Sequence, residues 1–350
     1  MPRLMFLVSS ALELPLDDGS SHPTGYFAEE ALTPYERFVA AGLDVDVVTP
    51  DGRPPYADPY GLDPIFHYPD EDEDFLASVT RTFAHDVDDI RLTLRHLTEL
   101  GLIGARRVFL AMREHGISPE DARGLVSTAA KTAWQQDRQF AEVLAAEVLS
   151  GPLSAADVDR AIAAVVDDSV AESQRVARAL EEIEGFRQPL NLADLTDEQI
   201  AAYDGIFAPG GHGPMVDLAD NADVTRVLAL MHEKQAPIAS LCHGPAMLLA
   251  APADGHGQWI FDGYRVTSIT NEEEYQTEPN ARPRAEGAPE VTGAVPWQLE
   301  SALRNAGVVF DDARAPWTSH VVVDRHLITG QNPNSSEAVA DSVLKALQIL

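Results

Sequence analysis

The chain of 350 residues contains one cysteine, Cys242, and its neighbours make it the first candidate for chemistry. The apolar run Pro237–Leu241 before it predicts a buried strand, and Pro245 after it predicts the start of a helix over Ala246–Ala251. A thiol on such a corner is expected to be exposed at the carboxyl end of a sheet. It would face the positive end of a helix dipole, which favours the thiolate. The alternative is a small buried apolar residue, as most free cysteines are.

A second candidate is the glycine-rich turn Pro209–Gly213, which directly follows the apolar run Gly205–Ala208. Glycines let a backbone turn sharply and point amide hydrogens into a cleft, as an oxyanion or carbonyl cradle requires. Gly210, Gly211 and His212 are therefore candidate oxyanion or substrate-binding residues. Parallel sheets collect their sites at the carboxyl ends of strands, so this turn and the cysteine corner are expected to lie together.

Two acidic segments could supply carboxyl groups to the same site. A carboxyl group of Glu29 or Glu30 near Cys242 could hold a proton at the sulfur if burial raised its pKa. A carboxylate within Thr270–Glu274 could orient the imidazole of His243 and set its tautomer. The alternatives are a solvated helix start for the first segment and a charged surface loop for the second.

The surrounding elements predict an α/β fold. Leu4–Val8 and Val45–Val48 have the pattern of core strands, and Tyr35–Ala41 between them has helical spacing. The pattern resumes after residue 203 and indicates a flavodoxin-like parallel sheet sandwiched by helices, with a mostly helical insertion. The further elements expected are strands at Gly205–Ala208, Pro237–Leu241, Arg265–Ile269, Val321–Val323 and Leu327–Thr329, and helices around Leu228–Met231 and over Ser336–Leu347.

Residues 76–187 interrupt the α/β pattern. This stretch lacks strand-like alternation and is rich in Ala, Leu, Arg and Glu, and Ala155–Ile183 has the pattern of one long helix with Ser154 as its cap. We therefore predict an α/β domain of residues 1–75 and 188–350 and a helical insertion of residues 76–187, which would serve as a lid or an oligomerisation element. The acidic run Asp70–Asp74 is interpreted as a solvated loop.

Composition excludes several classes of protein. The chain has 56 acidic and 25 Lys or Arg residues, for a net charge of −31, so we expect it to repel nucleic acid and anionic membranes. One cysteine excludes an internal disulfide and fits a reducing compartment. The start of the chain has no signal-peptide pattern, and no run of 18 apolar residues occurs. We expect a cytoplasmic protein.

The motifs together resemble those of the class I glutamine amidotransferase-like superfamily. Within it, the chain is similar to the branch of heat-shock chaperone/glyoxalase III proteins, relatives of the PfpI protease and the Parkinson-associated deglycase. The resemblance covers residues 1–75 and 188–350, and the insertion departs from it. The matching segments are Gly25–Tyr35, Ala208–Gly213, Leu241–Pro245, Thr270–Glu274, Pro316-Trp317 and Thr329–Ser336.

The resemblance implies roles for individual residues. Cys242 would be the nucleophile and His243 its base, and Glu274 would complete a triad, with Glu273 as the close competitor. Glu30 would be the carboxyl group that touches the sulfur, with Glu29 as the second choice. The backbone amides of Gly211 and His243 would bind the oxyanion.

The expected function is a cofactor-independent, glyoxalase III-type lyase that converts methylglyoxal and related 2-oxoaldehydes to 2-hydroxy acids, with deglycase or stress-protection activity as a related role. The alternatives are a cysteine hydrolase or peptidase of the PfpI type, and a holdase chaperone or redox sensor without turnover. We expect a small aldehyde substrate, a homodimer and no cofactor. No metal site is assigned, because His67 and His85 have the context of solvated loop histidines.

Overall fold

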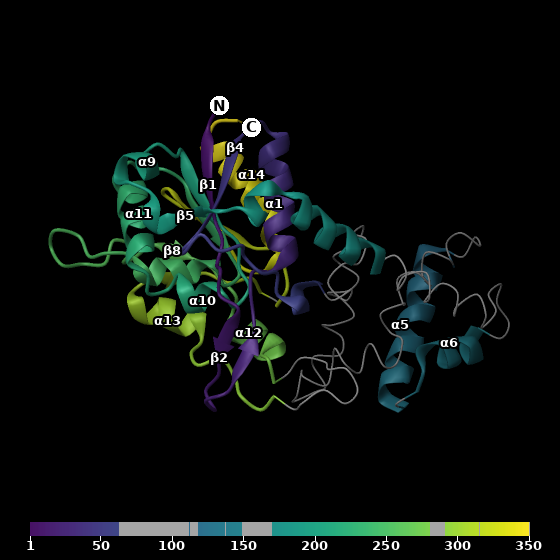
Figure 1. The fold of residues 1–350 in the computed structure, drawn as a ribbon. Helices are drawn as coiled ribbons and strands as arrows, with labels where there is room; N and C mark the ends of the chain where they lie inside the picture. The colour runs from purple at the N-terminus through teal and green to yellow at the C-terminus, as the bar shows by residue number, and fades with distance from the viewer. Residues whose placement is uncertain are drawn as a thin grey trace. The chain divides into compact units, whose positions relative to one another are not determined.

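The computed structural model describes residues 1–62, 112, 118–136, 138–148, 170–280, 291–314 and 316–349. The chain divides into two compact units, which are taken separately here. The first comprises Met1–Leu62, Arg175–Ala281 and Glu286–Leu350, and the second comprises Asp63–Gln174 and Arg282–Ala285 (Figure 1). The predicted acidic loop Asp70–Asp74, and His67 and His85, lie outside the described residues.

A seven-stranded sheet forms the centre of the first unit. Its order is β10-β11-β7-β6-β1-β4-β5, and all neighbours are parallel except the hairpin β10–β11. This confirms the predicted α/β class. The strands are β1 (Arg3–Leu7), β4 (Asp44–Thr49), β5 (Leu190–Asn191), β6 (Gly205–Ala208), β7 (Ile238–Leu241), β10 (Val321–Asp324) and β11 (Leu327–Gly330).

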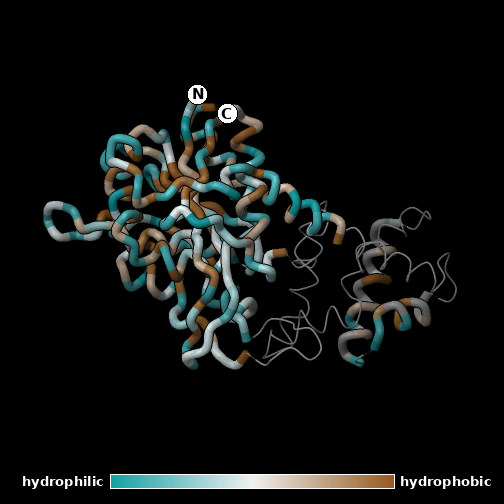
Figure 2. The backbone as a smooth tube through the Cα atoms, in the orientation of Figure 1, coloured by the Kyte–Doolittle hydropathy of each residue, from teal (hydrophilic) through white to brown (hydrophobic). Residues whose placement is uncertain are grey.

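Helices cover both faces of this sheet, and as a result β6, β7 and β11 are buried along their whole length. One apolar cluster joins the sheet to α1 (Ala28–Ala40) and α14 (Ser336–Ala346), and also takes in Val176 from the helical residues 170–182. The other joins it to α11 (Ala222–Glu233) and α13 (Leu299–Ala306). Figure 2 shows hydrophobic residues concentrated along the central strands of the first unit.

The other described elements of the first unit are short. They are β2 (Glu13–Pro15), β3 (Ser21–Pro23), η1 (Pro59–Leu62), α8 (Glu184–Arg187), η4 (Leu192–Asp194), α9 (Asp197–Ala201), α10 (Pro214–Asp217), η5 (Gly244–Ala250), β8 (Arg265–Val266), α12 (Asn271–Thr277), β9 (Val309–Phe310) and η6 (Pro333–Ser335). The second unit contains α5 (Pro119–Gln136) and α6 (Phe140–Val148). None of the described helices combines the length and the apolar character needed to cross a bilayer.

Three elements differ from the sequence prediction in ways that matter for the site. The first helix begins at Ala28 and not near Tyr35, which places Glu29 and Glu30 inside its first turn. The segment after Cys242 is a 3₁₀ helix, not an α-helix. The predicted strand Arg265–Ile269 is shorter, and it pairs with β9 outside the main sheet. Of the predicted helix Ala155–Ile183, only residues 170–182 are described as helical, and residues 155–169 lie outside the described part.

Candidate active site

Cys242 occupies a strained corner directly after β7. Its φ angle is 56°, in the left-handed region that costs a non-glycine residue energy. Two backbone hydrogen bonds hold this conformation: Cys242 N–H donates to Gly330 O (3.0 Å), and Ile269 N–H donates to Cys242 O (3.0 Å). Hydrogen bonds to β11 and to the segment before α12 therefore hold the backbone of Cys242 in this strained conformation.

The thiol is more enclosed than the sequence suggested. The residue is only 5% exposed, which corrects the expectation of an exposed cysteine. Burial raises the pKa of the Cys242 thiol well above its usual range, and the neighbouring carboxyl group of Glu30 raises it further. The expectation that a helix dipole favours a resting thiolate was therefore wrong. The short 3₁₀ helix η5 does not offset this desolvation, so the thiol needs a base at hand.

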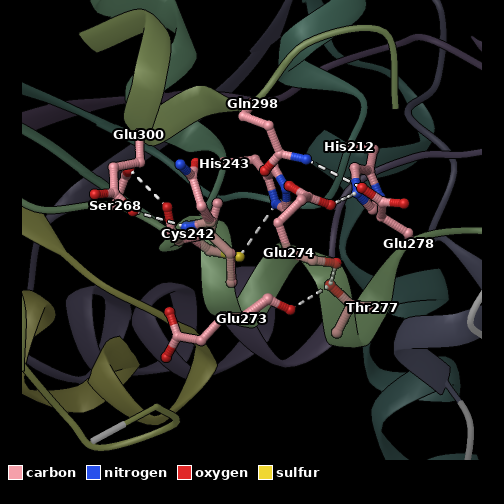
Figure 3. Close-up of polar contacts among 12 residues, drawn as sticks. His212, Cys242, His243, Ser268, Glu273, Glu274, Thr277, Glu278, Gln298 and Glu300 are labelled. Atoms are coloured by element: carbon pink, nitrogen blue, oxygen red, sulfur yellow. Dashed lines mark hydrogen bonds and ion pairs between the residues drawn. The ribbon is translucent and has the colours of Figure 1, made fainter. Parts of the chain in front are cut away.

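His243 is placed as that base. Its Nδ1 lies 3.3 Å from Cys242 Sγ, and its Nε2 lies 2.6 Å from Glu274 Oε2 (Figure 3). A carboxylate can only accept a hydrogen bond, so Nε2 carries the proton and donates it to Glu274. In the neutral ring this leaves Nδ1 with a free lone pair directed at the thiol. The arrangement can take the thiol proton and stabilise the resulting imidazolium.

Glu274 is shared by two histidines. His212 Nε2 lies 2.8 Å from Glu274 Oε1, on the opposite oxygen from His243 (Figure 3). The His212 and His243 rings stand 4.3 Å apart at their centroids. Burial alone would raise the pKa of Glu274, but the two imidazoles outweigh it and hold this pKa well below its usual range. The carboxylate therefore stays ionised.

Glu273, the competitor for the third position, points away from the histidines (Figure 3). Its Oε2 accepts the Thr270 N–H (3.0 Å), which completes a capping box at the start of α12. Its Oε1 accepts hydrogen bonds from Trp317 N (2.6 Å), Gln331 Nε2 (2.9 Å) and Asn332 Nδ2 (2.9 Å). The segment Thr270–Glu274 is thus a buried helix start and not a surface loop, and Glu273 fixes its position.

Glu30 approaches the thiol from the other side of the site. It is fully buried, its Oε2 accepts the Gly210 N–H at 2.8 Å, and its Oε1 has no nitrogen or oxygen partner among the described residues. Cys242 is the hydrogen-bonding neighbour of this carboxyl group. Burial raises the pKa of Glu30 to about 8, so the group holds a proton at neutral pH. Glu29 instead accepts a hydrogen bond from the Thr33 hydroxyl.

The glycine turn is built differently from the prediction. Because the Gly210 amide is committed to Glu30, it does not serve as an oxyanion donor. A Cβ at Gly210 would lie 2.6 Å from Glu30 Oε2 and 2.8 Å from Cys242 Cβ, so glycine lets these two groups meet. The amides of Gly211 (φ 84°) and His243 donate to no other described residue. They are the amides left for a substrate oxygen.

The structure adds a contact to His212 that the sequence did not predict, between its Nε2 and Glu274. Its role in substrate binding stays a prediction. No sequence signal indicated this contact, since residues 212 and 274 are far apart in the chain. Among the described residues, His212, His243 and Glu274 form a group that could hold a metal ion, with ligand atoms within 4.8 Å of one another. Each oxygen of the Glu274 carboxylate is hydrogen-bonded to an imidazole here, so a cation would have to displace these contacts.

Comparison with known proteins places this site in a family. The model of the DJ-1/PfpI family matches residues 168–346, just over half of the chain. The curated protein/nucleic acid deglycase HchA of Escherichia coli is 32% identical over 161 residues, 44% of this chain and 50% of the relative. The bovine (Bos taurus) glutamine amidotransferase-like class 1 domain-containing protein 1 is 32% identical over 144 residues, 41% of this chain and 59% of the relative. The chain thus spans about half the length of the curated relatives it matches.

Solved structures agree on the fold. Glyoxalase III from Candida albicans has a TM-score of 0.53 at 16% identity and covers 99% of this chain and 97% of its own. The Rapid Encystment Protein 24 KDa of Francisella tularensis has a TM-score of 0.55 at 18% identity, over 99% of both chains. At these identities the likeness concerns the fold alone. The family match, which includes the Cys242 corner, leads to the conclusion that the chain belongs to the DJ-1/PfpI family.

Proposed function

We propose that the protein is a cofactor-independent, glyoxalase III-type enzyme that converts methylglyoxal and related 2-oxoaldehydes to 2-hydroxy acids. The observation that carries this proposal is the position of Cys242 between a buried proton acceptor, His243, and a buried proton donor, Glu30. His243 can accept the thiol proton, while Glu30 can hold a proton of its own at neutral pH. A 2-oxoaldehyde needs both, because a proton has to leave one carbon and return to the next.

The reaction follows from these groups. The Cys242 thiol gives its proton to His243, and the sulfur attacks the aldehyde carbon to form a hemithioacetal. The amides of Gly211 and His243 would stabilise the oxygen as charge develops on it. His243 first passes the thiol proton to the oxygen of the adduct and, neutral again, removes the proton from the former aldehyde carbon to give an enediol. Glu30 donates its proton to the adjacent carbon and takes back the proton of the hydroxyl group on the sulfur-bearing carbon, which leaves the thioester. Water hydrolyses the thioester, which releases lactate and restores the thiol.

The enclosure of the site favours a small substrate over a peptide. Cys242 is 5% exposed, and the side chains of His243 and Glu274 are 4% and 1% exposed. A peptide or a protein would need a larger opening than these values leave. The E. coli deglycase, 32% identical over half of its length, and the C. albicans glyoxalase III, which has the same fold, agree with this proposal. A cytoplasmic homodimer stays a prediction, as do the lid or oligomerisation role of residues 76–187 and a stress-protection role.

The test is an assay for lactate formed from methylglyoxal without glutathione. We expect turnover by the wild type, none above background by Cys242→Ala, and wild-type turnover by His256→Gln, whose side chain is exposed. Peptide substrates are screened in parallel with the same variants. Hydrolysis of peptides that depends on Cys242, without lactate formation, would identify a hydrolase instead. Suppression of client aggregation by Cys242→Ala, with no turnover by the wild type, would identify a holdase.

A further inference from the structure

His212 is a buried histidine that the proposed reaction does not use. Its side chain is 3% exposed, and its Nε2 donates to Glu274 Oε1 at 2.8 Å. The turn that carries it is tightly held: a Cβ at Gly211 would lie 2.5 Å from Gly25 O, and a Cβ at Gly213 would lie 2.4 Å from Ser9 Oγ. In addition, Gly213 N–H donates to Gly25 O at 3.1 Å. The backbone on both sides of His212 is therefore closely packed.

A buried carboxylate held by only one hydrogen bond can rotate and lose the alignment of its partner. The geometry here prevents this rotation, because His212 holds Oε1 while Oε2 accepts the His243 Nε2–H at 2.6 Å. The two rings also pack against each other, at 4.3 Å between centroids. With both oxygens engaged, the carboxylate plane is fixed, and with it the tautomer of His243 that directs Nδ1 at the thiol.

We propose that His212 is a positioning residue: it clamps the free oxygen of Glu274 so that the carboxylate stays on His243 and His243 stays the base for Cys242. His212 thus acts through Glu274 and does not touch the substrate. This extends the Cys242–His243–Glu274 array to a fourth member and rests on the proposed use of Cys242 as nucleophile.

Alkylation of the thiol tests the proposal without any substrate, because Cys242 is the one cysteine of the chain. The rate of reaction with iodoacetamide is measured from pH 5 to 10 in the wild type, His212→Met, His212→Gln and Glu274→Gln. We expect His212→Met and Glu274→Gln to slow alkylation at neutral pH about tenfold and to shift the profile to higher pH by about one unit, because the thiolate loses its aligned imidazolium. His212→Gln, whose amide can donate from a position like that of Nε2, should stay within about threefold of the wild type.

The double variant His212→Met/Glu274→Gln gives the decisive comparison. If His212 acts only through Glu274, the double variant should be no slower than the slower single variant. Additive losses, an unshifted profile in His212→Met, or a failure of His212→Gln to restore the rate would each overturn the proposal. Circular dichroism and His256→Gln control for folding. Alkylation needs no methylglyoxal, so the two proposals can fail separately. If the variants change the alkylation profile as expected but the wild type forms no lactate, the glyoxalase reaction is rejected and the positioning role of His212 stands.

Discussion

The first turns of α1 and α12 each place a glutamate in the core beside the reactive pair, and the two carboxyl groups differ in protonation. Glu30 is 0% exposed and Glu274 is 1% exposed, so burial is the same. Glu30 has one amide and a thiol as partners, and its pKa rises to about 8. Glu274 has two imidazole N–H donors, and its pKa lies well below its usual range. Partners, and not burial, therefore decide which carboxyl group holds a proton at neutral pH and which is ionised.

Of the two glutamates, Glu274 is expected to show the larger effect on kcat when it is replaced. Glu274→Gln removes the charge that stabilises the His243 imidazolium, so kcat for lactate formation should fall by about a thousandfold. The matched control is Glu272→Gln, an exposed neighbour on the same helix, which should retain wild-type turnover. If Glu274→Gln kept most of its activity, the two glutamates would not differ in function.

Replacing Glu30 by the isosteric glutamine should lower kcat more than it lowers the stability of the fold. Glu30→Gln can still accept the Gly210 N–H and donate to the sulfur, but it cannot transfer a proton, so we expect kcat to fall by about a hundredfold with little change in melting temperature. Steady-state kinetics and thermal unfolding measure the two quantities. A large loss of stability together with the loss of rate would indicate that Glu30 serves packing alone.

The dependence of kcat on pH should contain a limb for the titration of Glu30 and none for Glu274. Glu30 acts in its protonated form, so kcat should decline as pH rises above about 8, by about tenfold per unit. Glu274 is ionised throughout and adds no limb of its own in the neutral range. The Glu30→Gln variant should lack the alkaline limb. An unchanged limb in that variant would assign it to another group.

The smallest effect is expected at Glu29. Its charge contributes to the raised pKa of Glu30, so Glu29→Gln should move the alkaline limb to lower pH by less than about one unit, with kcat at neutral pH unchanged. The shift is measured against the wild type at fixed ionic strength. A shift to higher pH would contradict the Coulombic origin of this contribution.

The sequence predicted most of the fold, and it named Cys242, His243, Glu274 and Glu30, which the structure brings together. Apolar strand segments that alternate with segments of helical spacing predicted the sheet. The apolar run before Cys242 and the proline after it predicted that Cys242 and His243 lie at the end of a strand. The sequence did not separate Glu273 from Glu274, because that choice depends on the residue at which α12 begins. It also missed the state of the thiol, the use of the Gly210 amide and the contact of His212 with Glu274, since all three depend on burial between distant segments.

The capping box of α12 has a consequence for insertions and deletions. Successive residues on an α-helix point about 100° apart, so Thr270 and Glu273 set the angular phase at which the next side chain, Glu274, leaves the helix. Loss of one residue between the cap and Glu274 would preserve composition, charge and helical propensity almost entirely. It would nevertheless rotate the rest of the helix by about 100° relative to its cap. This rotation would separate the Glu274 carboxylate from the imidazoles of His212 and His243. The length of this segment is therefore as strict a requirement as its glutamates.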